Sequence, residues 1–189
     1  MIIAISGASG SGKTYLSEHI KNLPSIKKIE VISIDNYYKN KEKEKFENYD
    51  HPNAFDIQTL LNDIHIFINE SRVVKRLYSF TSKNSNITGS VHNVDILILE
   101  GLYSYFYREF KHLVDLKVFL DMDIEKSMQR RIRRDKIERE IQEEENIKMI
   151  NSFVLKMYYK FVTQQIKDAD IVLRDLVDID LIIDRVDEK

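Results

Sequence analysis

The chain of 189 residues contains no cysteine. It therefore has no disulfide framework, no thiolate metal site and no cysteine nucleophile. It also lacks any hydrophobic run long enough to cross a bilayer, and its first residues are typical of a strand rather than of a secretory signal. These absences predict a cytoplasmic protein that has no membrane partner.

The chain has no excess of charge of either sign, because 29 Lys and Arg residues stand against 31 Asp and Glu residues. A protein that holds a long nucleic acid by its phosphates carries a clear surplus of basic residues. We therefore expect a small-molecule ligand and no nucleic acid. With 43% hydrophobic residues, a chain of this length is expected to form one domain, residues 1–189, around one core.

Glycine is scarce too, but three of the five glycines lie at positions 7, 10 and 12, directly after an apolar run at residues 2–5. Glycine lets the backbone bend so that amide N–H groups point inward, and it leaves room for a phosphate to approach. A helix that begins at this point adds free N–H groups and a positive dipole end. The segment has the phosphate-binding pattern GxxxxGKT in its required context, and its residues are Gly7, Ala8, Ser9, Gly10, Ser11, Gly12, Lys13 and Thr14.

The last two side chains of this motif predict its ligand. Lys13 would neutralise the β- and γ-phosphates, and the Thr14 hydroxyl would complete the coordination of a Mg²⁺ ion that otherwise keeps water and phosphate oxygens. The alternative, a turn with an incidental lysine, is disfavoured because strand, motif and helix occur together. We predict a site for ATP or GTP with Mg²⁺. The helix is expected over residues 13–22, with one side formed by Tyr15, Leu16, His19 and Ile20.

Short apolar runs alternate with helical patterns along the chain. Most of the runs lack polar alternation, as strands buried on both faces of a parallel sheet do. The runs cover residues 2–5, 29–34, 96–99, 116–120 and 171–173. With a phosphate loop after the first strand, this order predicts an α/β fold with a doubly wound, five-stranded parallel sheet. Helices are expected after Asp56, after Asp123, over 147–161 and over 176–186.

Two segments do not fit this alternation. Residues 36–55 are polar and aromatic without a steady period, and a connection of this length usually covers a ligand. We interpret the segment as a substrate loop in which the charged run 41–45 is solvated. Residues 73–91 hold two β-prone runs around a polar turn and predict an inserted β-hairpin.

Acidic residues follow three of the apolar runs, and in a doubly wound sheet the ligand lies at the carboxyl ends of the strands. Asp35 follows the second run, where a carboxylate can take the proton of a hydroxyl that attacks the γ-phosphate. Glu100 follows the third run and resembles the acid that holds Mg²⁺ in phosphate-loop proteins. The alternatives are a helix-cap or loop acid for Asp35 and a plain strand-ending acid for Glu100. Asp121 and Asp123 are expected to start and cap the next helix.

That helix is rich in arginine, which offers the positive charge that a transferring phosphoryl group requires. At 100° per residue, Arg131 and Arg134 lie within about 60° of one another. They are expected to swing over the site together, as part of a helical lid at residues 130–146. Arg130 and Arg133 are expected on a solvated face of the helix.

Several motifs together resemble those of the uridine kinase family, the uridine/cytidine kinases of pyrimidine salvage. The order and spacing match over nearly the whole chain at residues 7–14, 33–38, 49–56, 99–101 and 130–135. The most specific piece is the DHPNAFD stretch, since many unrelated NTPases share the phosphate loop. The resemblance implies a P-loop kinase fold and transfer of the γ-phosphate of ATP to the 5′-hydroxyl of a pyrimidine ribonucleoside.

The resemblance also implies roles for individual residues and a homotetrameric assembly. Asp35 would be the base and a neighbour of Mg²⁺, and Asp50 would hold the ribose hydroxyls. Because a carboxylate can accept hydrogen bonds from both vicinal hydroxyls, Asp50 would favour ribose over deoxyribose. The other implied residues are Tyr38, Tyr49 and Tyr78 beside the nucleoside and the lid cations Arg131, Arg134 and Arg139.

The chain departs from the family pattern at two positions. Lys83, assigned here to substrate binding, stands where the family has a histidine that reads the pyrimidine, and Ile141 replaces a lid arginine. Lysine only donates hydrogen bonds, whereas neutral histidine donates or accepts. A related P-loop kinase for nicotinamide riboside, pantothenate or a phosphosugar is therefore one alternative. The other is a nucleotide-binding regulator without transfer activity, which would not need Lys13, Thr14, Asp35, Glu100 and Arg131 together.

Replacement of Asp35 by asparagine tests its role as the base. Asparagine keeps the size of the side chain but cannot accept a proton, so turnover should fall by about two to four orders of magnitude. ATP binding should stay largely intact. Steady-state kinetics and titration with ATP measure the two quantities, and unchanged turnover would remove Asp35 from the mechanism.

Overall fold

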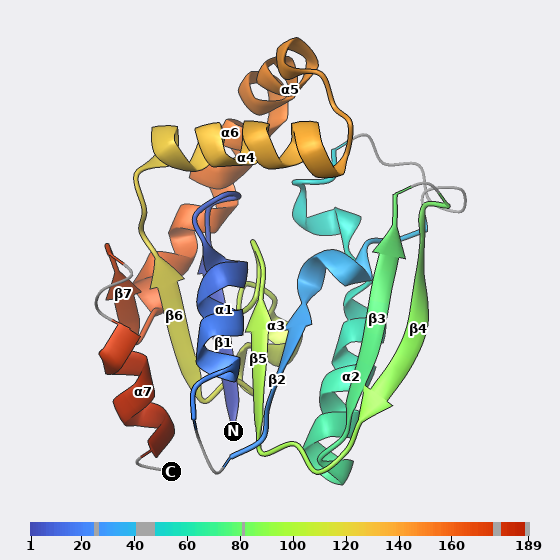
Figure 1. Cartoon of the computed structure of the whole chain (residues 1–189), viewed down its shortest axis with the longest axis vertical. Coiled ribbons are helices and arrows are strands. Elements are labelled where there is room, and N and C mark those ends of the chain that lie inside the picture. The colour runs from blue at the N-terminus through green and yellow to red at the C-terminus, as the bar shows by residue number, and fades with distance from the viewer. Residues whose placement is uncertain (25–26, 41–47, 81, 176–178, 188–189) are drawn as a thin grey trace.

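A computed structural model describes residues 1–24, 27–40, 48–80, 82–175 and 179–187. Its centre is a five-stranded sheet in the order β2-β5-β1-β6-β7, in which every neighbouring pair is parallel (Figure 1). The first strand of the chain lies in the middle of the sheet, so the predicted doubly wound α/β fold is confirmed. The strands are β1 Ile2–Gly7, β2 Ile29–Ser33, β5 Ile96–Glu100, β6 Leu116–Leu120 and β7 Ile171–Leu173.

Two of the helices, α2 and α4, begin where an aspartate side chain satisfies a free backbone N–H group. The Asp56 carboxylate accepts from the N–H of Thr59 at 3.0 Å, and the Asp123 carboxylate accepts from the N–H of Lys126 at 2.9 Å, as the sequence predicts. The helices are α1 Lys13–Lys21, α2 Ile57–Glu70, α3 Arg108–Lys111, α4 Ile124–Glu138, α5 Glu143–Met149 and α7 Asp180–Asp187. The chain stays helical after α5 through η3 Ile150–Val154, α6 Leu155–Met157, η4 Tyr158–Val162 and η5 Thr163–Asp168.

Two hydrophobic layers cover the two faces of the sheet. Ile5 of β1 is buried in one layer with Leu16 of α1 and Ile182 of α7. Ala4, whose side chain points to the opposite face, is buried in the other layer with residues of α2, α3 and η4. Because both faces are covered, the strands carry apolar residues at successive positions and not only at alternate ones.

The predicted sidedness of α1 is wrong for Tyr15 and His19, both of which are exposed. Leu16 and Ile20 are buried against the sheet, whereas the Tyr15 side chain is 67% exposed and stacks on His19. Successive residues of a helix point about 100° apart, so this short helix buries Leu16 and Ile20 one turn apart and leaves Tyr15 and His19, the residues before them, in solvent.

The connection from β2 to α2 has a short 3₁₀ helix at each of its ends. It begins with η1 Ile34–Tyr37 and ends with η2 Pro52–Ala54, and a single antiparallel bridge joins Tyr38 to Phe55. This bridge closes the base of the predicted substrate loop. The charged run at 41–45 lies outside the described residues.

The predicted hairpin is confirmed as β3 Val73–Ser79 and β4 Asn84–Val91, which form a separate two-stranded antiparallel sheet. It is attached to the segment after β2 by two hydrogen bonds. The N–H of Tyr78 donates to the Asn36 side chain at 3.2 Å, and the Ser85 hydroxyl donates to the Asn36 carbonyl at 2.6 Å. The hairpin therefore stands beside β2 and α2 and rises toward the end of α4 (Figure 1).

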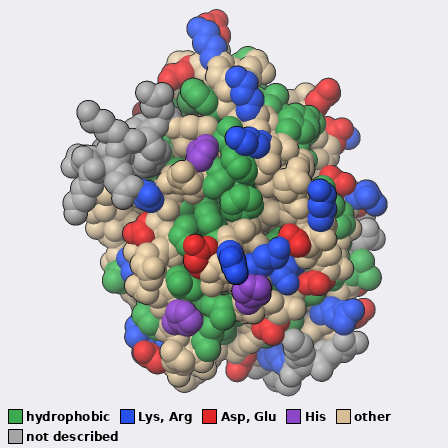
Figure 2. Space-filling view, turned by 180° about the vertical axis from the view of Figure 1, so that it is seen from behind, with side chains coloured by type: hydrophobic (Ala, Val, Ile, Leu, Met, Phe, Trp, Pro, Cys, Tyr) green, Lys and Arg blue, Asp and Glu red, His purple; other side chains and the backbone are tan. Residues whose placement is uncertain are grey.

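The face of the molecule opposite to that of Figure 1 carries a strip of hydrophobic side chains along its middle, with charged side chains around it (Figure 2). In the hydrophobic layer that contains Ala4, the partly buried Phe161 makes edge contacts with Phe106 and with the ring of His51.

Within the described part of the chain, none of the helices combines the length and the apolar character needed to cross a membrane.

Helix α4 lies directly on the phosphate loop at Gly10. A Cβ atom at Gly10 would stand 2.1 Å from the Ser127 carbonyl oxygen and 3.1 Å from the Arg131 backbone nitrogen. The residue also has φ of 75°, a left-handed conformation that favours glycine. Glycine at this position thus sets the closest approach of α4 to the loop.

Replacement of Gly10 by alanine should push α4 away from the loop and lower the free energy of unfolding by about 1–3 kcal/mol. The matched control is Gly89→Ala, because a Cβ atom at Gly89 meets no other atom within 4 Å. The control should change stability by less than about 0.5 kcal/mol. Urea denaturation of the two variants measures both changes in the free energy of unfolding. Equal changes would show that the contact between Gly10 and α4 leaves room for a methyl group.

Candidate active site

The parallel register brings polar residues of three strands to one edge of the sheet. Ile5 of β1 pairs with Glu100 of β5, and Glu100 pairs in turn with Ser33 of β2. The phosphate loop follows β1 and Asp35 follows β2, so both begin near the level of Glu100. Ligand sites of doubly wound sheets form at this edge.

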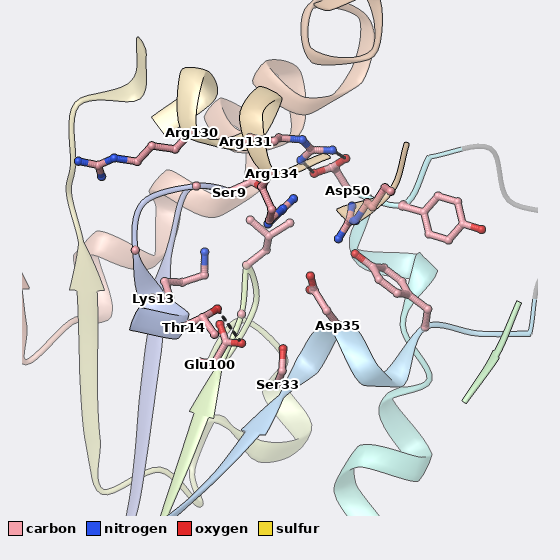
Figure 3. Close-up of a pocket in the computed structure, with 17 residues that line it drawn as sticks. Ser9, Lys13, Thr14, Ser33, Asp35, Asp50, Glu100, Arg130, Arg131 and Arg134 are labelled. Atoms are coloured by element: carbon pink, nitrogen blue, oxygen red, sulfur yellow. Dashed lines mark hydrogen bonds and ion pairs between the residues drawn. The ribbon is translucent and has the colours of Figure 1, made fainter. Parts of the chain in front are cut away.

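A cavity of about 400 Å³ lies above this edge, with α4 as its roof (Figure 3). Its lining comes from the phosphate loop, the end of β2, the segment around Asp50, the end of β5 and the arginines of α4. The lining residues are Ser9, Gly10, Gly12, Lys13, Thr14, Ser33, Asp35, Tyr38, Tyr49, Asp50, Glu100, Gly101, Leu102, Arg130, Arg131, Arg134 and Arg139.

The phosphate loop ends in a lysine that is buried among backbone oxygens. Gly12 has φ of 102° and is the N-cap of α1, so the loop enters the helix through a conformation that suits glycine. The Lys13 ammonium donates to the carbonyl oxygens of Ala8 at 2.7 Å and Gly7 at 3.1 Å. Burial lowers the pKa of Lys13, and the charge of Glu100 opposes that shift.

Beside the lysine, Thr14 and Glu100 bring together two side-chain oxygen atoms of the kind that bind hard cations. The Thr14 hydroxyl donates to Glu100 Oε1 at 3.3 Å, and Glu100 is only 4% exposed. Burial raises the pKa of the Glu100 carboxyl, an effect that Lys13 opposes. A buried carboxylate that needs positive charge, next to a hydroxyl, fits Mg²⁺, which binds through one or two carboxylates together with phosphate oxygens and water.

Asp35 lies in η1, directly after β2, and its carboxylate points into the cavity (Figure 3). The same view shows Lys13 and Arg134 directed into this space from the loop and from α4. Asp35 therefore lies between the phosphate loop and the segment that carries Asp50. This is the position that a base for an incoming hydroxyl requires.

Asp50 and Arg131 form a buried ion pair that joins the segment before α2 to helix α4. Arg131 Nη1 lies 2.7 Å from Asp50 Oδ1, and Nη2 lies 3.2 Å from Oδ2. The two side chains are only 8% and 10% exposed. Burial lowers the pKa of Arg131, but the charge and hydrogen bonds of Asp50, together with the charge of Asp135, outweigh this effect. The pKa is therefore raised and the guanidinium stays charged.

Two tyrosines of the segment after β5 hold the backbone around Asp50. The Tyr103 hydroxyl donates to the Asp50 carbonyl at 2.6 Å, and the Tyr107 hydroxyl donates to the Pro52 carbonyl at 2.7 Å. The N–H of Asp50 also donates to the side chain of Asn48 at 2.9 Å. The Asp50 carboxylate is thus presented from a fixed backbone.

Aromatic rings form the wall next to Asp50. Tyr38 lies edge-on to Tyr49 and Tyr78, with centroid distances of 5.2 and 5.3 Å. Phe80, which no motif of the sequence marks as a site residue, contacts Tyr49, and its ring lies 4.5 Å from the guanidinium of Arg139. Burial raises the pKa of the Tyr38 phenol well above its ordinary value, so this ring is neutral.

The structure brings most of the predicted site residues together, but not all of them. Tyr78 is buried behind Tyr38 and does not line the cavity. Lys83 is exposed in the turn of the hairpin, outside the cavity lining. In the phosphate loop, Gly7, Ala8 and Ser11 are buried and do not line the cavity.

The expectation for Arg130 is wrong in part. Arg130 is exposed, as expected, but it also lines the cavity. It extends away from Asp50, on the side of β6, whereas Arg131 reaches Asp50 and Arg134 points down toward Lys13 (Figure 3). Because α4 lies across the top of the site, neighbouring positions of one helix reach its two ends.

A phosphate loop after the first strand of a parallel sheet, with a carboxylate beside it and arginines above it, defines a P-loop phosphotransferase. Over residues 2–182 the chain matches the family model described as "Phosphoribulokinase / Uridine kinase family". The chain belongs to this family.

Relatives of this family match along most of the chain. The chain is 34% identical over 196 residues to the uridine kinase of Lactobacillus helveticus, covering 100% of this chain and 93% of the relative. It is 37% identical over 180 residues to the uridine kinase of Mycoplasma genitalium, covering 92% and 84%. The match thus includes both the phosphate loop and the arginine-rich helix.

Solved structures share the fold at lower identity. A possible uridine kinase from Bacillus stearothermophilus superposes with a TM-score of 0.67 at 17% identity, over 93% of this chain and 88% of the other. Phosphoribulokinase from Rhodobacter spheroides superposes with a TM-score of 0.63 at 17% identity, over 92% and 69%. At such identities the likeness concerns the fold alone.

Replacement of Asp50 by alanine should lower the free energy of unfolding by about 3–5 kcal/mol, because it leaves the Arg131 charge buried without its bidentate partner. The matched control is Asp168→Ala, which removes an exposed ion pair with Lys111. Its cost should stay below about 1 kcal/mol. Guanidinium denaturation measures both, and a loss at Asp50 as small as that at Asp168 would contradict the importance of burial.

Proposed function

We propose that this protein is a nucleoside kinase that transfers the γ-phosphoryl group of ATP to the 5′-hydroxyl of uridine or cytidine. The observation that carries the proposal is the arrangement of one cavity. The phosphate loop lies at one end, the Asp50–Arg131 pair lies at the other, and Asp35 lies between them. Uridine kinases that match nearly the full length of the chain support the same substrate.

In the proposed reaction, the 5′-oxygen forms a bond to the γ-phosphorus while the bond from that phosphorus to the β–γ bridging oxygen breaks. ADP leaves, and the hydroxyl proton passes to the Asp35 carboxylate. Lys13 and Arg134 approach the transferring group from the loop and from α4. Their charges stabilise the negative charge on its oxygens.

The residues present fit a Mg²⁺ ion brought in with the nucleotide. Thr14 and Glu100 would hold it, with Asp35 as a neighbour, and the remaining positions would belong to water and phosphate oxygens. When bound, the ion would neutralise charge on the β- and γ-phosphates. Asp35 would then face the metal and also accept the proton.

The acceptor end suits a ribose. The Asp50 carboxylate can accept hydrogen bonds from the 2′- and 3′-hydroxyls, and Arg131 beside it can donate to them. The rings of Tyr38 and Tyr49 line the adjoining wall and offer an apolar surface for the base. Arg131 is therefore assigned to the acceptor, and Arg134 is the arginine assigned to the phosphates.

The wider proposals follow the family resemblance. The chain would act as a single domain in pyrimidine salvage in the cytoplasm, with residues 130–146 as a lid and four copies in the assembly. The lid proposal also has structural support, because α4 covers the cavity and contacts the phosphate loop at Gly10. Light scattering of the purified protein tests the tetramer.

The alternative of another P-loop kinase rests on Lys83, whose charge would suit an anionic acceptor. Lys83 lies in the hairpin turn, away from the cavity lining, which weakens that alternative. The alternative of a regulator without transfer activity leaves the base, the metal carboxylate and the arginines without a purpose. The pyrimidine ribonucleoside is the acceptor that we retain.

A panel of acceptors tests the function directly. Uridine and cytidine should be phosphorylated with ATP, and 2′-deoxyuridine should react about tenfold or more slowly, because Asp50 and Arg131 lose a partner. Nicotinamide riboside, pantothenate and phosphosugars should not react. Turnover with one of these but not with uridine would contradict the proposal, as would no turnover with any acceptor.

Replacement of Asp50 by asparagine should reduce the preference for uridine over 2′-deoxyuridine. The matched control is Asp56→Asn in the same DHPNAFD stretch. Asp56 caps α2 and does not line the cavity, and asparagine caps helices nearly as well as aspartate. The ratio of kcat/KM for the two nucleosides measures the effect, and an unchanged ratio in Asp50→Asn would rule out the ribose role.

A further inference from the structure

The arginines of α4 share one buried carboxylate. Asp135 has a side chain with 0% exposure. Its Oδ1 accepts from Arg134 Nη2 at 2.7 Å and from Arg134 Nε at 3.0 Å. Arg139 Nε lies 3.6 Å from Oδ1, and Arg131 Nε lies 3.4 Å from Oδ2. Three of the four arginines that line the cavity therefore lie within ion-pair distance of one acid.

The same residue also builds the junction between α4 and α5. The Asp135 carbonyl accepts from the N–H groups of Arg139 and Ile141, both at 3.1 Å, where α4 ends. Asn146 of α5 is fully buried and donates through Nδ2 to Asp135 Oδ2 at 3.3 Å. Helix α5 thus fixes the carboxylate, and the carboxylate fixes the arginines.

From these contacts we propose that Asp135 is a positioning residue that holds the lid arginines as one preorganised set above the phosphate loop. The inference rests on the proposed function, because it names the group that aims the cations of that site. Asp135 does not line the cavity, so it acts through the arginines.

The physical need for such a residue follows from the charges. Guanidinium groups that gather over one site repel each other, and a free arginine side chain loses rotamer entropy when it is fixed. A buried carboxylate offsets the repulsion and fixes the side chains before substrate binds. A displacement of about 1 Å in such a group can cost about 100-fold in rate.

Arg131 connects this set to the acceptor end. Its guanidinium faces Asp50 through Nη1 and Nη2 and faces Asp135 through Nε. The contact at Gly10 already seats the α4 backbone on the loop. What Asp135 determines is therefore the direction of the side chains and not the place of the helix.

The test is Asp135→Asn, which keeps the shape of the side chain and removes its charge. We expect kcat for uridine phosphorylation to fall by about 30- to 100-fold at saturating substrates, with the KM for ATP changed by less than about threefold. The matched control is Glu138→Gln, which removes the same charge from an exposed position of α4 and should leave kcat within about twofold of wild type. A kcat within twofold in Asp135→Asn would overturn the inference.

A double-mutant cycle separates positioning from a structural role. If Asp135 acts through Arg134, the loss caused by Asp135→Asn should shrink to about threefold or less in an Arg134→Ala background. A full loss in that background, multiplying the effect of Arg134→Ala, would assign Asp135 to general stability and contradict the inference.

NMR spectra of the arginine Nε–H groups provide a readout that does not depend on activity. In the wild type, the Nε–H of Arg134 should give a dispersed, slowly exchanging signal, because it donates to a buried carboxylate. This signal should collapse in Asp135→Asn, and its survival would overturn the inference. If the wild type phosphorylates no nucleoside, the proposed function fails, and the NMR result alone decides the role of Asp135.

Discussion

The parallel pairing of β2, β5 and β1 is the constraint on which the whole site depends. It fixes Ser33, Glu100 and the start of the phosphate loop at one edge of the sheet. Both faces of the sheet are covered by helices, so this register cannot slip without moving buried side chains into the wrong layer. The core of the sheet therefore sets the position of the donor end of the cavity.

The acceptor end depends on long-range charge pairs instead. Helix α4 contacts the phosphate loop at Gly10 and pairs with Asp50 through Arg131, so one helix connects the two ends of the cavity. The buried charges of the site have opposite charges nearby, with Lys13 beside Glu100 and the arginines around Asp135. A buried ion pair is favourable only when the two charged groups are well aligned and their remaining polar atoms also form hydrogen bonds. This explains why tyrosines fix the backbone that presents Asp50 and why Asn146 of α5 donates to the Asp135 carboxylate.

Local patterns were sufficient to predict the fold and the donor end. Strands, caps and the phosphate loop depend on residues close in sequence, and Asp35 and Glu100 are identified because each follows a buried strand. The partner of Arg131 could not be predicted, because Asp50 lies 81 residues away and no local pattern joins the two. Phe80 beneath Arg139 was missed for the same reason. Asp135 looks like a charge that balances a solvated helix, yet its spacing of four, one and four residues from Arg131, Arg134 and Arg139 was a usable signal.

The central claim is that one cavity holds a nucleotide on residues 7–14 and a ribonucleoside at Asp50. Its most direct test is the affinity of an analogue in which adenosine and uridine are joined through their 5′-oxygens by a polyphosphate chain. The account predicts that this compound binds far more tightly than ATP or uridine alone, and that each of the two displaces it competitively. Displacement by ATP alone, with uridine binding undisturbed, would place the nucleoside elsewhere and contradict the account.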